Sequence, residues 1–204
     1  MTFKSLIAAL LMFSGAMLIQ PVCAAESAPQ QLIRQTADDV LAAIKTNQEE
    51  YRKEPAKLYA MVDQRVLPNF DFERMTDLAL GRYKRQVDSA QKDQLVTAFR
   101  NLLVRTYGKA LLEYTNQTIQ YLPSRGKIAE GEVTIRTEID QQGGFPIPIN
   151  YEMYLKNGSW KVFDISIDNI SLVTNYRSSF AQEIKANGID NLIKTLQDKN
   201  KQES

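Results

Sequence analysis

The sequence predicts an α+β fold in which N- and C-terminal helices wrap a curved, four-stranded antiparallel sheet. Apolar residues recur three or four positions apart up to about Tyr114, then alternate with polar residues from Asn116 to Asp168. Helical spacing returns from Ser171 onward. Short turn sequences separate the alternating segments, which is typical of an antiparallel meander. Strands placed between two sets of helices indicate one α+β domain.

Helix-capping signals mark the ends of several predicted helices. Asn69 or Asp71 is suited to cap a short helix that ends at Gly81. Asp88 and Gln91 resemble a capping box at the start of the longest helix. We expect helices over residues 31–53, 55–67, 71–80, 88–114, 171–187 and 190–199.

Turn signals and irregularities define the strands. Gln141–Gly144 and Asn157–Gly158 are typical of hairpin turns. Pro146 and Pro148 cannot donate to a ladder, so their segment is expected at a sheet edge or a bulge. The apolar alternation slips between Val162 and Phe163, which predicts a bulge there. We expect strands over residues 116–122, 132–139, 145–156 and 160–168.

The N-terminus has the parts of a secretory signal peptide. Lys4 precedes the apolar run Leu6–Ile19, and small residues follow. The run is shorter than the roughly 20 residues that a membrane span needs. We therefore expect residues 1–25 to be a leader, cleaved after Ala24 or Ala25. A retained anchor and a lipid attached to Cys23 are the alternatives.

The predicted mature chain, residues 26–204, is a single domain. It carries 24 basic and 24 acidic residues and contains neither cysteine nor histidine. A neutral chain is not typical of nucleic-acid binding, and a chain without cysteine forms no disulfide. No second apolar segment is long enough to cross a bilayer, which indicates a soluble protein. Together with the leader, this leads us to expect an exported protein in a bacterial periplasm. We expect it to be a monomer.

The composition also removes most catalytic chemistry. Without histidine and cysteine there is no Ser–His or Cys–His pair. The commonest zinc ligands are missing too. We expect no catalytic residue, metal or cofactor. The alternatives are an enzyme for apolar substrates on a cone-shaped, curved-sheet fold, and a protein-interaction or envelope-structural module with a filled core.

Polar residues between the last strand and the next helix are the candidates for the enzyme alternative. Asp164, Tyr176 and Arg177 would be its catalytic groups. The structural interpretation is that Asp168 and Asn169 form the turn and cap the helix. Asp164 and Arg177 are then ordinary partners of oppositely charged side chains.

Three stretches resemble the MlaC family, whose members are also called toluene tolerance or phospholipid-binding proteins. They are LPNFDFERMTDLALGRY, AFRNLLVRTYGKAL and WKVFDISIDNISLVTNYRSSF. The resemblance implies a twisted sheet wrapped by helices, with acyl chains in a deep apolar cavity between the layers. It also implies a carrier that moves glycerophospholipids across the periplasm. Its partners would be an outer-membrane lipoprotein–porin complex and an inner-membrane ABC transporter with an MCE-domain subunit.

Apolar residues on both layers are the predicted lipid contacts. Such a set alone indicates either a plain core or a cavity. The predicted contacts are Phe70, Met75, Phe99, Leu103, Tyr107, Ile135, Ile149, Tyr151, Met153, Phe163, Ile165, Val173 and Tyr176. Basic residues would dock an acidic partner, face the phosphate, or lie on a merely solvated surface. These residues are Arg82, Lys84, Arg85, Arg100 and Arg105.

Overall fold

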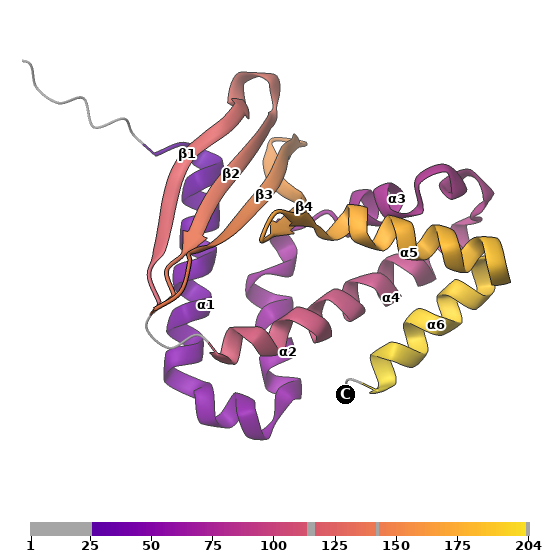
Figure 1. Cartoon of the computed structure of the whole chain (residues 1–204), viewed down its shortest axis with the longest axis horizontal. Helices are drawn as coiled ribbons and strands as arrows, with labels where there is room; N and C mark the ends of the chain where they lie inside the picture. The colour runs from indigo at the N-terminus through magenta and orange to yellow at the C-terminus, as the bar shows by residue number, and fades with distance from the viewer. Residues whose placement is uncertain (1–25, 114–116, 142, 203–204) are drawn as a thin grey trace, which may run out of the picture.

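The computed structural model describes residues 26–113, 117–141 and 143–202, so the predicted leader lies outside the described residues. Figure 1 shows the helices and strands in the predicted order. The helices are α1 (Ala28–Lys53), α2 (Pro55–Arg65), α3 (Phe72–Leu80), α4 (Ser89–Gly108), α5 (Leu172–Asn187) and α6 (Ile189–Gln202). The strands are β1 (Ile119–Lys127), β2 (Glu132–Ile139), β3 (Ile147–Lys156), β4 (Ser159–Ile167) and β5 (Ile170–Ser171). Short 3₁₀ helices are η1 (Leu67–Asn69), η2 (Gly81–Gln86), η3 (Lys109–Glu113) and η4 (Ile128–Glu130).

The strands form one antiparallel sheet in the order β1-β2-β3-β4-β5. The sheet therefore has one strand more than predicted. Asp168 and Asn169 both have positive φ, 49° and 64°, as the two central residues of a type I′ hairpin require. The predicted turn is confirmed, and it returns the chain onto β4. A strand as short as β5 has too few residues to show an alternation.

The bulge in β4 is confirmed, but two other details of the strands are corrected. Glu152 pairs with Asp164 while Met153 pairs with Val162, so Phe163 is the extra residue. The first strand runs beyond Leu122 to Lys127, because a second bulge accommodates the segment around Pro123. The third strand begins at Ile147 and leaves Phe145 93% exposed.

The prediction that Pro148 marks a sheet edge or a bulge is wrong, because β3 pairs on both sides. Pro148 pairs with Glu138 of β2, and its carbonyl accepts a hydrogen bond from the Asp168 N–H at 2.9 Å. The N–H and C=O of one residue in an antiparallel strand face the same neighbour. The backbone N–H that Pro148 lacks would therefore point toward the end of β4. The ladder between β3 and β4 stops there, at the pair of Ile149 and Ile167.

Capping explains where the helices begin and end. The Asp71 carboxylate accepts a hydrogen bond from the Arg74 N–H at 3.0 Å at the start of α3. Asp88 and Gln91 form the predicted capping box of α4. Gly81 ends α3 with a φ of 55°. α4 ends at Gly108 and continues as η3, and the predicted helix end at residue 114 lies outside the described residues. None of the described helices combines the length and the apolar character that crossing a membrane requires.

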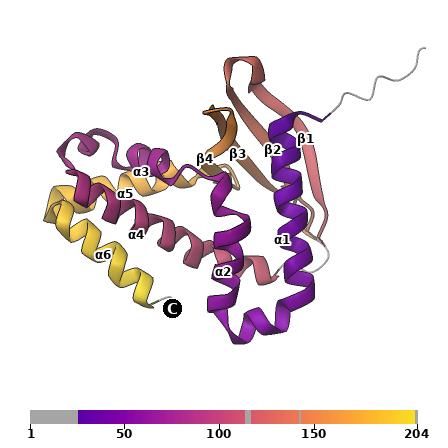
Figure 2. The ribbon, with the colours of Figure 1, turned by 180° about the vertical axis from the view of Figure 1, so that it is seen from behind.

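The buried apolar residues form three clusters. The helical cluster consists of Met75, Ala79, Leu80, Tyr83, Leu95, Ala98, Phe99, Leu102, Leu103, Leu172, Val173, Phe180, Ile184, Leu192, Ile193 and Leu196. The basal cluster consists of Val40, Ile44, Tyr51, Leu58, Met61, Val62 and Leu112. The sheet cluster consists of Ile33, Val133, Ile135, Met153 and Val162. α1 runs alongside β1 and β2 in both Figure 1 and Figure 2, and α4, α5 and α6 form the opposite side of the molecule.

Candidate functional site

The candidate site is the apolar face of the sheet, called here the inner face. Strand register places every second residue of neighbouring strands on the same side. The inner face consists of Ile119, Tyr121, Val133, Ile135, Thr137, Ile139, Ile147, Ile149, Tyr151, Met153, Val162, Ile165 and Ile167. Ile33 of α1 packs on it within the sheet cluster. Ile135, Met153 and Val162 are 0% exposed, so the middle of this face is closed to solvent.

The helical cluster and the sheet cluster share two apolar neighbours. Phe70 and Ile165 are half-buried and pack against both the helical cluster and the sheet cluster. Phe70 is held there because it forms a parallel bridge with Val162. The two clusters therefore meet along a line of incompletely buried apolar groups, called here the junction of Phe70 and Ile165.

The predicted lipid contacts divide between the two sides of this junction. Ile149 lies on the inner face, half-buried and outside all three clusters. On the helical side, Met75, Phe99, Leu103 and Val173 are buried, and Tyr107 and Tyr176 pack against the same cluster. On the sheet side, Ile135 and Met153 are buried, and Tyr151 packs against them.

Phe163 does not belong to the inner face. As the extra residue of the bulge it turns to the opposite face, where its ring meets the Tyr154 ring at 5.7 Å between centroids. The Arg74 guanidinium lies 3.9 Å from the Phe163 centroid and 4.0 Å from the Tyr154 centroid. An extra residue at a bulge does not follow the alternation of side chains along a strand. The prediction that Phe163 points to the inner face is therefore wrong.

Two polar residues of the inner face, Tyr121 and Thr137, were not among the predicted contacts. They pair with each other, and the predicted contact Tyr151 lies on the next strand. Burial raises the pKa of Tyr121 to about 12, and burial also raises the pKa of Tyr151. The Thr137 hydroxyl donates to the Ile149 carbonyl at 2.9 Å. The alternation of Ile119 with Tyr121 is the signal that could have placed Tyr121 on this face.

A buried carboxylate fastens the start of α3 to the sheet. The Asp71 side chain is 4% exposed and accepts from the Lys156 ammonium at 2.7 Å and from the Tyr154 hydroxyl. The Asp71 N–H also donates to the Val162 carbonyl at 2.9 Å. Burial alone would raise the pKa of Asp71, but its hydrogen bonds to Lys156, Tyr154 and the Arg74 backbone together lower it. This network fixes the position of Phe70, the neighbouring residue.

The groups proposed for an enzyme each have a structural contact. The Asp164 carboxylate accepts from the Ser171 hydroxyl and from the Val173 N–H at 3.1 Å, at the N-terminus of α5. The expected partner of Asp164 was a basic side chain, and the helix N-terminus takes that place. Ser171, not Asp168 or Asn169, is the N-cap residue of α5.

The other two groups of the enzyme hypothesis belong to helix packing. Arg177 donates to the Leu78 carbonyl at 2.8 Å, near the end of α3. Tyr176 packs edge-on against Phe99, with 5.0 Å between ring centroids. Each of the three groups therefore has a role in holding the helices together.

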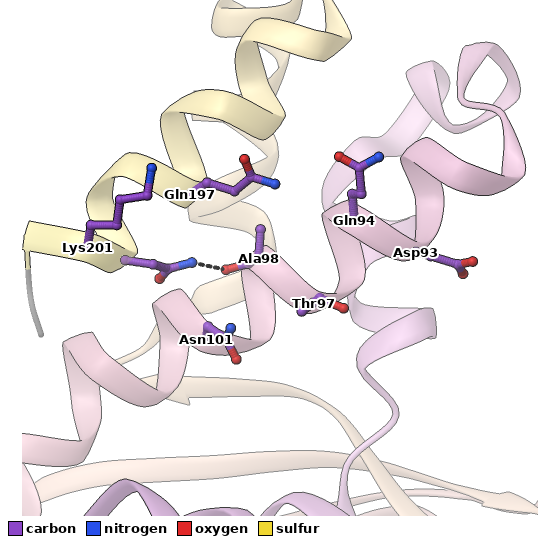
Figure 3. A pocket seen from close by; sticks show the side chains of 8 residues that line it. Asp93, Gln94, Thr97, Ala98, Asn101, Gln197 and Lys201 are labelled. Atoms are coloured by element: carbon purple, nitrogen blue, oxygen red, sulfur yellow. Dashed lines mark hydrogen bonds between the residues drawn. The ribbon is translucent and has the colours of Figure 1, made fainter. Parts of the chain in front are cut away.

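Two surface hollows lie away from the inner face. One, of about 480 Å³, lies between α4 and α6 and is lined by Asp93, Gln94, Thr97, Ala98, Asn101, Gln197, Asn200 and Lys201 (Figure 3). The Asn200 amide donates to the Ala98 carbonyl across it at 2.9 Å. The other, of about 740 Å³, surrounds the turn at Gly126–Glu132. The first is lined mostly by polar residues, and the second lies around an exposed turn.

The five basic residues singled out in the sequence fall into two groups. Arg82 donates to the Tyr83 hydroxyl at 3.0 Å, and Lys84 and Arg85 are exposed beside it in η2. Arg100 and Arg105 lie on α4, where Arg105 covers the Tyr59 ring and Arg100 bonds to Asn101. The two groups belong to different elements, and neither lies on the inner face.

Comparison with known proteins identifies the family. The model of the MlaC protein family matches residues 34–198. The chain belongs to the MlaC family. It is 28% identical over 186 residues to the intermembrane phospholipid transport system binding protein MlaC of Haemophilus influenzae, covering 89% of this chain and 86% of that protein. It is 26% identical over 173 residues to the toluene tolerance protein ttg2D of Pseudomonas putida, covering 84% and 80%.

A solved structure shares the fold. It is a phospholipid-binding protein from Ralstonia solanacearum in complex with a phospholipid, 34% identical to this chain. The TM-score is 0.79, and the match covers 85% of this chain and 97% of that structure. The predicted family and the α+β fold with an antiparallel sheet are thereby confirmed.

Proposed function

We propose that this MlaC-family protein is a phospholipid carrier and not an enzyme. One observation carries the proposal: the helical and sheet clusters meet along half-buried apolar residues, Phe70 and Ile165, instead of forming one continuous core. Acyl chains would enter at this junction and cover the inner face. The bound phospholipid is the cargo, and the protein supplies no chemistry. The related Ralstonia protein, whose structure holds a phospholipid, supports this assignment.

The physical need for such a carrier follows from the cargo. Two chains of about 16 carbons cost on the order of 20 kcal/mol when exposed to water, at roughly 0.8 kcal/mol per CH₂. Free diffusion between membranes is therefore negligible. A carrier must bury the chains about as favourably as a bilayer does. Tighter binding would prevent release.

Loading requires the two sides of the junction to separate. Two acyl chains need a cavity approaching roughly 1,000 Å³, whereas Ile135, Met153 and Val162 are fully buried. We propose that α4, α5 and α6, which carry most of the helical cluster, move away from the inner face and that Ile149, Tyr151 and Ile165 line the opened space. α3 stays with the sheet during this movement, because the Asp71 network fastens its start there.

Membership of the MlaC family supports a proposal for the route of the cargo. The exported, leader-free protein is proposed to act as a monomer in the periplasm. It would exchange glycerophospholipids between an outer-membrane lipoprotein–porin complex and an inner-membrane ABC transporter with an MCE-domain subunit. This exchange would maintain the lipid asymmetry of the outer membrane. Sequencing the N-terminus of the exported protein checks the leader: the mature chain is expected to begin at Ala25 or Glu26.

A vesicle assay tests the proposed function. Mature protein is mixed with donor vesicles containing radiolabelled phospholipid, and the vesicles are removed by flotation. Labelled lipid is expected to stay with the protein and to pass to fresh acceptor vesicles. Protein that carries no label above a denatured control would refute the carrier.

A further inference from the structure

We propose that the hydroxyl group of Tyr121 donates a hydrogen bond to an ester carbonyl oxygen of the bound lipid. This inference rests on the proposed function and adds the group that sets how deeply a diacyl lipid sits. It makes Tyr121 a determinant of the class of lipid that is bound.

The first observation is an unsatisfied donor on the inner face. Tyr121 pairs with Thr137 across β1 and β2, and its ring packs against the sheet cluster. Its hydroxyl oxygen is buried and makes no hydrogen bond within the part of the chain that the structure describes. A buried polar group without a partner is destabilising. A ligand that supplies an acceptor at this point would remove that penalty.

The neighbouring polar group already has a partner. The Thr137 hydroxyl donates to the Ile149 carbonyl. Burial raises the pKa of Tyr121 to about 12, so the phenol keeps its proton at neutral pH and remains a donor. Tyr121 is therefore the side chain on this part of the face that is suited to bind an incoming acceptor.

The surroundings of the Tyr121 hydroxyl favour a neutral acceptor over a phosphate. The Arg34 guanidinium carbon lies 3.7 Å from the centroid of the Tyr121 ring, and the same guanidinium forms an ion pair with Glu26 at 2.9 Å. Arg34 acts on Tyr121 as a positive neighbour, and Asp38 and Glu26 act as weaker negative ones, so the nearby charges are of both signs. The hydroxyl itself is buried beside the sheet cluster, where an anionic phosphate would lose far more hydration than an ester carbonyl.

The chemistry of a diacyl lipid matches this site. Its ester carbonyls lie where the head group meets the chains, and each accepts hydrogen bonds but donates none. An ester moved out of water into an apolar site loses those bonds unless the protein offers a donor. Lipid and protein therefore each supply the partner that the other lacks.

A comparison of ester and ether lipids tests the inference. A diester phosphatidylcholine competes with its dialkyl-ether analogue, which has the same chains but no carbonyls. The competition is measured for binding to wild-type protein, to Tyr121→Phe and to Tyr83→Phe. Bound lipids are counted by mass spectrometry. Tyr83 is the control because its hydroxyl bonds to Arg82, in the helical cluster.

Wild type and Tyr83→Phe are expected to prefer the diester by roughly tenfold, the effect of one hydrogen bond. Tyr121→Phe is expected to bind both lipids equally. Equal binding of both by wild type, or an unchanged preference in Tyr121→Phe, would overturn the inference. An equal weakening of both lipids by Tyr121→Phe would place the contact on the phosphate and also overturn it. Wild type that binds neither lipid would refute the proposed function itself.

A measurement on wild type alone covers the case in which Tyr121→Phe does not fold. Diester lipid labelled with ¹³C at its carbonyls is bound to the protein, and the infrared carbonyl band is recorded. A band at the lower frequency of a hydrogen-bonded ester supports the inference. A single band at the frequency of an ester in hydrocarbon would overturn it.

Discussion

The carboxylate of Asp71, at the start of α3, lies 2.7 Å from the ammonium of Lys156, at the end of β3. The two residues are 85 positions apart in the sequence. Phe70, next to Asp71, lies at the junction between the helical and sheet clusters. The ion pair therefore sets the position of a residue in the candidate site, although neither of the two side chains lies on the inner face.

The ion pair makes stability depend on pH. The pKa of Asp71 is lowered below its ordinary 3.8, so its contribution is present above about pH 4 and is lost as the pH falls through the folded-state pKa. The pKa of Lys156 is raised above 10.5, so its contribution is present below that pH and is lost as the pH rises further. Asp71→Asn is expected to lower the free energy of unfolding by about 1–3 kcal/mol at pH 7. Urea unfolding should show this difference shrinking below pH 4. A difference that stays constant from pH 7 to pH 3 would contradict the assignment.

Gly81 is expected to tolerate no side chain. Its φ of 55° is unfavourable for other residues, and a Cβ there would lie 3.2 Å from the Arg177 Nε. Gly81→Ala is expected to cost about 1–3 kcal/mol in thermal unfolding. Gly108→Ala is the matched control: a Cβ there meets the Tyr59 ring at an ordinary 3.5 Å, within helix α4. The control should be neutral or stabilising by up to about 1 kcal/mol. Equal costs for both variants would refute the conformational explanation.

Asp164 distinguishes a carrier from an enzyme. Its carboxylate accepts hydrogen bonds at the start of α5, so Asp164→Asn is expected to cost about 0.5–2 kcal/mol of stability. The lipid content of the folded protein should not change. Asp168→Asn in the neighbouring turn is the control and should alter neither property, because asparagine accepts positive φ. Loss of lipid transfer in folded Asp164→Asn would contradict the purely structural role assigned to this carboxylate.

Adjacent residues of β3 test which face of the sheet binds lipid. Ile149 lies on the inner face, and Asn150 lies on the opposite face between Arg136 and Ser166. Ile149→Glu would place a charge against acyl chains and is expected to lower bound lipid by at least about tenfold. Asn150→Glu should bind as wild type does. Circular dichroism confirms that both variants fold, and equal lipid binding by both would place the site elsewhere.

Local signals in the sequence predicted much of this architecture. Asp71 and Asp88 cap their helices as expected, and the phase slip beside Phe163 marks a real bulge. The direction of Phe163 was not predictable, because an extra residue breaks the alternation. The strand β5 has too few residues to show a period.

Long-range pairing is what the sequence could not supply. The apolar residues of the site were expected from their types and spacing, but not their division between two clusters. That division depends on Phe70 meeting Val162, some 90 residues later in the chain. Asp164 likewise finds its partners only because the type I′ turn brings Ser171 back beside β4.

The most direct test of the carrier is native mass spectrometry of the mature protein purified from the periplasm of cells that export it. We predict a population whose mass exceeds that of the chain by one phospholipid, released as intact lipid on collisional activation. Protein that is consistently empty, and that takes up no lipid when incubated with vesicles, would contradict the account.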